Sequence, residues 1–184
     1  MATIFVIGYM ASGKTTFGRA LARRLGYEFI DLDFYITQRF RRSVAQLFAE
    51  KGEAWFRARE SDMLREIGEM DNAVIACGGG TPCFDDNMEF MNAHGLTVLL
   101  EASEDCTLRR LLEAKKGKRP LTAGKSPDEL REFIRTHKAE RAPFYGKARL
   151  LLPSDDLESS RQIDLTVDRF LAMVPDLQTT QKPF

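Results

Sequence analysis

The glycine-rich segment near the N-terminus has residue types and a spacing that suit phosphate binding. Gly8–Thr15 reads Gly-Tyr-Met-Ala-Ser-Gly-Lys-Thr and fits the pattern G-x-x-x-x-G-K-[ST]. Gly8 and Gly13 allow the backbone to aim N–H groups inward, where they and a helix N-terminus bind phosphate oxygens. Lys14 adds a positive charge near the β- and γ-phosphates, and the Thr15 hydroxyl can ligate Mg²⁺. We therefore predict a nucleoside triphosphate site whose contacts are Gly8, Ala11, Ser12, Gly13, Lys14, Thr15 and Thr16.

Two aspartates lie where ligands of an α/β sheet gather. Glu28–Leu32 reads as a strand, and Asp31 and Asp33 stand at its carboxyl end. Side chains two apart in a strand point the same way, so both carboxylates would face one side. One could hold a metal-bound water while the other accepts a proton from an acceptor hydroxyl. Two solvated loop acids are the alternative, but the neighbouring phosphate motif favours a functional pair.

Three glycines and two arginines add candidate ligand contacts. Gly78-Gly79-Gly80 follows a predicted strand, and the absence of side chains would let backbone amides approach a ligand closely. A tight turn without a ligand would look the same. Arg57 and Arg141 lie in predicted helices, and arginine fits a carboxylate bidentately. For any single arginine among so many, the residues alone favour a solvated surface position.

Buried strands alternate with amphipathic helices along the chain, which predicts an α/β fold with a mainly parallel sheet. Capping boxes at Ser43 and Ser126 mark two helix starts. The segment 113–125 between two predicted helices is strongly basic and lacks apolar periodicity, so it is either a solvated loop or a lid. The predicted strands are Thr3–Ile7, Glu28–Leu32, Ala73–Cys77, Thr97–Glu101 and Arg149–Leu152.

Length and composition limit the function classes. The 184 residues suit one globular domain, and 43% apolar residues can form a core. Because 27 basic residues balance 27 acidic ones, a protein devoted to binding nucleic acid or anionic membrane is not expected. Three cysteines without a Cys-x-x-Cys motif argue against a disulfide framework or a zinc site. We find neither a signal peptide nor a bilayer-spanning run and therefore expect a cytoplasmic protein.

These motifs, in this order, resemble the shikimate kinase family. The resemblance covers Ile4 to about Leu152 and includes Phe-Arg-x-x-Glu at 56–60, Arg-Pro-Leu at 119–121 and Arg-x-Pro-Phe-Tyr at 141–145. It implies a three-layer α/β/α P-loop fold with a five-stranded parallel sheet of order 2-3-1-4-5. It also implies a single kinase domain over 1–184, with a shikimate-binding region at about 33–61 and a lid at about 113–125. The implied reaction is ATP-dependent phosphorylation of the 3-hydroxyl of shikimate, in the route to chorismate and the aromatic amino acids.

The resemblance also implies a role for each matching residue. Asp33 would bind the acceptor hydroxyl and serve as base, and Glu60 would steady a substrate-binding arginine. Lys14 and Arg119 would flank the transferring phosphoryl group. Mg²⁺ would be held by Thr15 and, through water, by Asp31. The implied shikimate contacts are Asp33, Arg57, Gly79, Gly80 and Arg141.

Some features stay open at this point. Arg109 and Arg110 are both candidates for the arginine that stacks on adenine, and we favour Arg110. Cys77 stands where the family often has a small residue such as threonine or serine, which predicts only a packing change. Another small-molecule kinase of this fold, for gluconate or a nucleoside monophosphate, is the main alternative, and a non-catalytic nucleotide-binding regulator is another. Family resemblance suggests a monomer.

Overall fold

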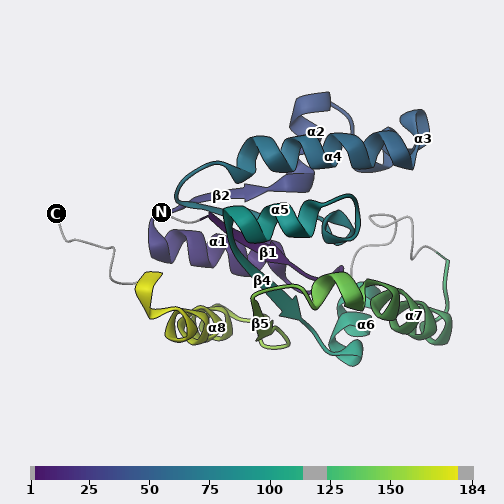
Figure 1. The fold of residues 1–184 in the computed structure, drawn as a ribbon. Coiled ribbons are helices and arrows are strands. Elements are labelled where there is room, and N and C mark those ends of the chain that lie inside the picture. The colour runs from purple at the N-terminus through teal and green to yellow at the C-terminus, as the bar shows by residue number, and fades with distance from the viewer. Residues whose placement is uncertain (1–2, 114–123, 178–184) are drawn as a thin grey trace.

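The computed structural model describes residues 3–113 and 124–177. Its centre is a five-stranded parallel sheet with the strand order β2-β3-β1-β4-β5 (Figure 1). The α/β class and the strand order implied by the resemblance are therefore confirmed. The strands are β1 (Thr3–Ile7), β2 (Glu28–Asp31), β3 (Ala73–Ala76), β4 (Gly95–Glu101) and β5 (Leu150–Pro153).

Helices cover both faces of this sheet, which confirms the three-layer arrangement (Figure 1). Helices α1 and α8 pack on one face, and α4, α5 and α7 pack on the other. None of the described helices is long and apolar enough to cross a membrane. The helices are α1 (Lys14–Leu25), α2 (Leu32–Phe40), α3 (Val44–Lys51), α4 (Glu53–Gly68), α5 (Asn87–His94), α6 (Glu104–Glu113), α7 (Pro127–Tyr145) and α8 (Ser160–Met173), with short 3₁₀ turns at Thr81–Cys83 and Pro175–Leu177.

The central strand β1 explains why the sheet needs two helical layers. All five residues of β1 are buried, and successive side chains point to opposite faces. Ile4 and Val6 join the core beneath α1 and α8, whereas Phe5 and Ile7 join the core on the opposite face. A strand that is apolar on both faces is stable only when both are covered, so the sequence of β1 already requires this layering.

The second strand is shorter than predicted, and the helix after it was missed. Strand β2 ends at Asp31, and α2 begins at Leu32. The side chain of Asp31 caps this helix by accepting a hydrogen bond from the amide of Phe34 at 3.2 Å. Helix α2 ends at Phe40, and its C-cap residue Arg41 lies in the left-handed region with φ of 51°, so the helix lacks the glycine that marks a helix stop in sequence. Strand β1 has the predicted bounds, and the bounds of β3, β4 and β5 agree with the predicted ones to within two residues.

Candidate active site

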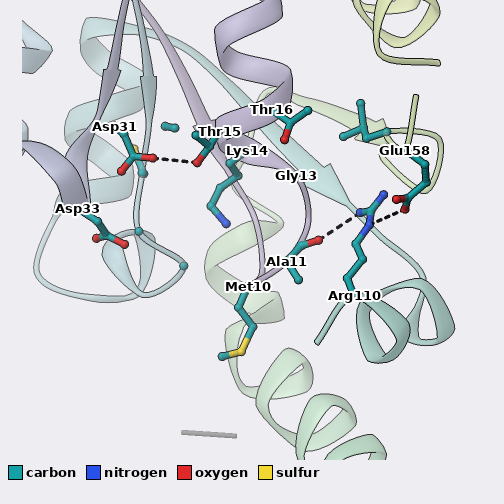
Figure 2. Close-up of a pocket in the computed structure, with 15 residues that line it drawn as sticks. Met10, Ala11, Gly13, Lys14, Thr15, Thr16, Asp31, Asp33, Arg110 and Glu158 are labelled. Atoms are coloured by element: carbon teal, nitrogen blue, oxygen red, sulfur yellow. Dashed lines mark hydrogen bonds and ion pairs between the residues drawn. The ribbon is translucent and has the colours of Figure 1, made fainter. Parts of the chain in front are cut away.

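A cavity of about 490 Å³ lies at the carboxyl ends of β2 and β3, next to the N-terminus of α1. Figure 2 shows Asp31 and Asp33 on one side of Lys14, and Arg110 with Glu158 on the other. The structure thus brings the predicted nucleotide and acid residues together. Of the other predicted residues, Gly8, Ser12, Arg57, Gly80 and Arg141 do not line this cavity. The lining consists of Met10, Ala11, Gly13, Lys14, Thr15, Thr16, Asp31, Asp33, Ala76, Cys77, Gly78, Gly79, Arg110, Leu157 and Glu158.

The phosphate loop has the geometry that its motif predicts. Gly13 caps α1 in the left-handed region, with φ of 92°, and no side chain caps this helix end. A Cβ atom at Gly13 would lie 2.5 Å from Cδ1 of Leu157, so no larger residue fits without a shift. The amides of the first helical turn lack intrahelical partners and carry the positive end of the helix dipole. This end of α1 is therefore suited to bind phosphate oxygens.

Lys14 extends back over the same loop. Its Nζ atom donates hydrogen bonds to the carbonyl oxygens of Gly8 and Tyr9, both at 2.8 Å. These contacts hold the ammonium group inside the curve of the loop, where it lines the cavity. A bound phosphate group there would meet a positive charge that is already positioned.

Thr15 and Asp31 form an oxygen pair in the cavity. Oγ1 of Thr15 donates a hydrogen bond to Oδ2 of Asp31 at 2.8 Å (Figure 2). The other oxygen, Oδ1, is the one that caps α2. A hydroxyl beside a carboxylate is the kind of oxygen set that Mg²⁺ prefers, usually with several waters and substrate phosphates completing its coordination. The residues present therefore fit a magnesium ion.

Asp33 reaches the cavity from the first turn of α2 and not from a strand. The prediction that Asp31 and Asp33 share one face of β2 was therefore wrong. The strand ends at Asp31, and the helix capped by Asp31 begins at Leu32, before Asp33 is reached. Solvent reaches Asp33 through the cavity, but burial of its carboxyl group, followed by the charges of Glu60 and Asp31, raises its pKa to about 6. Lys14 and Arg57 oppose this rise. A carboxylate with such a pKa can accept a proton near neutral pH more readily than an ordinary aspartate.

Arg57 is held by a buried carboxylate. Its Nη1 atom donates to Oε2 of Glu60 at 2.7 Å, and Oγ1 of Thr81 donates to Oε1 of the same carboxylate, also at 2.7 Å. Glu60 is 1% exposed, so its charge is compensated inside the protein by these partners. The guanidinium carbon of Arg57 also lies 4.1 Å from the ring centroid of Phe84. These contacts confirm that Glu60 contacts Arg57; sequence reasoning missed Thr81.

The three glycines bring separate site residues close to one turn. A Cβ atom at Gly78 would lie 2.9 Å from Oδ1 of Asp33, and one at Gly80 would lie 2.8 Å from Nη2 of Arg57. At Gly79 it would lie 3.3 Å from Nη1 of Arg141. The turn thus has room for an acid and two arginines because it has no side chains. Nη1 of Arg141 also donates to the carbonyl oxygen of Gly79 at 2.9 Å.

Arg110 lies at the other end of the cavity, over the phosphate loop. Its guanidinium group donates to the carbonyl oxygen of Ala11 at 3.2 Å and to Oε1 of Glu158 at 3.0 Å (Figure 2). Arg109 also donates to Glu158, at 2.9 Å, but it does not line the cavity. The geometry therefore favours Arg110 over Arg109 as a nucleotide contact. Sequence reasoning missed Glu158 and Leu157, which follow β5 and carry no motif of their own.

One predicted group falls on residues that the structure does not describe. Arg119 and most of the predicted lid, residues 114–123, lie outside the described residues. Their proposed part in the reaction stays a prediction.

Comparisons with known proteins identify the family of this chain. A protein-family model described as shikimate kinase matches residues 10–172. Shikimate kinase from Bacteroides thetaiotaomicron is 51% identical over 169 residues, which is 92% of this chain and 96% of that protein. A crystal structure of shikimate kinase from the same organism superimposes with a TM-score of 0.91 at 49% identity, covering 95% of this chain and 98% of the other. The shikimate kinase of Acinetobacter baumannii in complex with shikimate has a TM-score of 0.79 at 30% identity, covering 99% and 96% of the two chains. The chain belongs to the shikimate kinase family.

Proposed function

We propose that this protein transfers the γ-phosphoryl group of ATP to the 3-hydroxyl of shikimate and so forms shikimate 3-phosphate and ADP. The observation that carries this proposal is that Asp33, Arg57 and Arg141 each lie against one glycine of the turn 78–80, next to the phosphate loop. Family membership supports the same reaction. The product would serve the route to chorismate and the aromatic amino acids.

In this proposal, positively charged groups and backbone amides surround the phosphoryl group during its transfer. Transfer of a phosphoryl group depends mainly on positioning and on stabilising the charge that spreads over its oxygens. The amides of the phosphate loop and Lys14 hold the donor phosphates, and Arg119 completes the cationic surroundings from the lid. Asp33 accepts the hydrogen bond and then the proton of the attacking 3-hydroxyl. Arg110 contacts the nucleoside and stacks on adenine.

The acceptor is held by its carboxylate. Arg57 and Arg141 approach Gly80 and Gly79 respectively, so their guanidinium groups can bind one carboxylate between them. Glu60 supports this arrangement because it fixes Arg57 through the 2.7 Å contact. The backbone of Gly79 and Gly80 would then contact the acceptor directly.

Magnesium would occupy the position between Thr15, Asp31 and the nucleotide phosphates. The Thr15 hydroxyl would bind the ion directly, and Asp31 would act through a water molecule. When bound, the ion would neutralise charge on the β- and γ-phosphates during transfer.

We further propose one kinase domain over 1–184, with the acceptor-binding region at about 33–61 and the lid at about 113–125. The balanced charge of the chain supports a cytoplasmic enzyme without nucleic-acid or membrane partners. The active unit is a monomer in this proposal, and sedimentation of the purified protein tests it.

An ADP-release assay with a panel of acceptors tests the reaction. With Mg²⁺ and ATP, we expect turnover with shikimate and little or none with gluconate, quinate or nucleoside monophosphates. The two-arginine carboxylate site beside Asp33 is the reason for this preference. Turnover with gluconate or a nucleoside monophosphate but not with shikimate would refute the assignment, and no turnover with any acceptor would favour a nucleotide-binding regulator.

A further inference from the structure

The side chain of Tyr9 leaves the phosphate loop and enters the core. Tyr9 is 3% exposed and belongs to the apolar cluster that α7 also joins. Its main-chain carbonyl, by contrast, accepts hydrogen bonds from Nζ of Lys14 at 2.8 Å and from the amide of Ser12 at 3.2 Å. The two parts of Tyr9 therefore act separately: the main chain shapes the loop, and the side chain contacts another element.

That contact is made with His137 on α7. The Tyr9 hydroxyl oxygen lies 3.1 Å from Nδ1 of His137, and the two rings meet edge to face with centroids 5.6 Å apart. Burial and the charge of Arg141 lower the pKa of His137, against a smaller opposing effect of Glu140. Burial also raises the pKa of the Tyr9 phenol. Both groups are therefore neutral at neutral pH, and they share one hydrogen bond whose donor is set by the tautomer of His137.

His137 lies on the face of α7 that reaches the acceptor side of the site. His137, Arg141 and Tyr145 are spaced four residues apart, so they share one face of the helix. The guanidinium carbon of Arg141 lies 5.8 Å from the Tyr9 ring centroid, and Tyr145 donates to the carbonyl oxygen of Gly79 at 2.7 Å. This face thus touches both the phosphate loop and the glycine turn.

Arg141 cannot by itself fix the position of α7. Its Nη1 atom donates to the Gly79 carbonyl and is also one of the donors that a bidentate carboxylate contact can use, so the two ligands would compete for it. The Tyr9–His137 hydrogen bond lies one helical turn away, is partly buried and uses none of the donors of Arg141, so a carboxylate bound to Arg141 would leave it intact.

We infer that the Tyr9–His137 hydrogen bond is a positioning contact that fixes α7 against the phosphate loop and thereby sets the position of Arg141 toward the acceptor carboxylate. The inference rests on the proposed function, since it takes Arg141 as a carboxylate ligand. Neither Tyr9 nor His137 contacts the reacting atoms in this scheme.

Steady-state kinetics of the full-length enzyme with Mg²⁺, ATP and shikimate test this contact. Tyr9→Phe removes only the hydroxyl and keeps the main-chain contacts to Lys14 and Ser12. We expect the KM for shikimate to rise about 3- to 10-fold, the worth of one neutral hydrogen bond, while the KM for ATP and kcat stay near those of the wild type. Tyr27→Phe is the matched control, because Tyr27 precedes β2 at the end of the sheet opposite the cavity, and its kinetics should not change.

Variants of His137 separate positioning from a general loss of stability. His137→Asn can keep a hydrogen-bonding atom near Nδ1 and should retain most shikimate affinity. His137→Leu should raise the KM for shikimate at least as much as Tyr9→Phe, because it leaves the Tyr9 hydroxyl buried without a partner. The double variant Tyr9→Phe/His137→Leu should do no worse than His137→Leu alone, since both changes remove one interaction.

Two results would overturn the inference. One is an unchanged KM for shikimate in folded Tyr9→Phe, even if its melting temperature falls, because the contact would then serve stability alone. The other is additive effects of Tyr9→Phe and His137→Leu on the KM. A wild-type enzyme that does not turn over shikimate would instead refute the proposed function, so the two failures are distinguishable.

Discussion

Asp33 offers the sharpest test of the mechanism because its raised pKa predicts how kcat/KM depends on pH. Its pKa is raised from 3.8 to about 6, first by burial and then by the charges of Glu60 and Asp31. If Asp33 accepts the hydroxyl proton, only its ionised form is active. At one pH unit below this pKa about a tenth of the enzyme is ionised, so kcat/KM should fall about tenfold for each pH unit below 6.

Replacing the carboxylate tests the assignment directly. Asp33→Asn keeps the shape of the side chain but removes the negative charge, and we expect kcat to fall by about 10²–10⁴. The fall of kcat/KM at acid pH should also disappear in this variant, because the titrating carboxyl group is gone. The assay is ADP release with saturating Mg²⁺ and ATP and varied shikimate, from pH 5 to pH 8.

The stability of the same variant serves as a control, and the direction of the expected stability change follows from the pKa shift of Asp33. Between pH 3.8 and about 6 the folded protein binds more protons at Asp33 than the unfolded chain, so the ionised group lowers the free energy of unfolding as pH rises through this window. Asp33→Asn should therefore melt at pH 7 no lower than the wild type. Lost activity together with a lower melting temperature would mean misfolding.

Two outcomes would refute the reasoning about Asp33. A wild-type acid limb that persists unchanged in Asp33→Asn would assign the titration to another group. A small loss of kcat with a large rise in the KM for shikimate would make Asp33 a positioning residue, which a loose transition state with little need for a base also allows.

Three further substitutions test other parts of the site. Lys14→Met should lower kcat by about 10²–10³ in a folded protein, because it removes a positioned charge from the transferring phosphates, and near-normal kcat would remove the phosphate-loop assignment. Arg141→Ala should weaken the binding of shikimate by about 2–5 kcal/mol and should raise the KM for shikimate far more than the KM for ATP. Equal effects on the two KM values would count against the carboxylate site. Thr81→Val should lower the free energy of unfolding by about 1–3 kcal/mol in urea titrations, because Oε1 of the buried Glu60 loses its hydrogen-bond donor. Thr81→Ser keeps a hydroxyl group and should retain most of the wild-type free energy of unfolding. Equal stability of Thr81→Val and Thr81→Ser would contradict that role.

The sequence by itself determined the elements whose causes are local. The phosphate loop was predictable because its glycines, its lysine and the helix that follows lie within a few residues of one another. The capping boxes at Ser43 and Ser126 were confirmed for the same reason, since each links residues three apart. The apolar runs of the strands predicted the parallel sheet. Helix α2 was missed because its cap, Asp31, was already assigned to the strand before it.

Tertiary structure decided the contacts that hold the site side chains. Thr81 meets Glu60 across 21 residues of sequence, and Arg110 meets Glu158 across 48. Tyr9 meets His137 across 128 residues. No periodicity or motif links such pairs, because each contact depends on how whole helices and strands pack. The sequence therefore predicted the residues that would carry the chemistry, and packing of the elements selected the partners that orient the described ones.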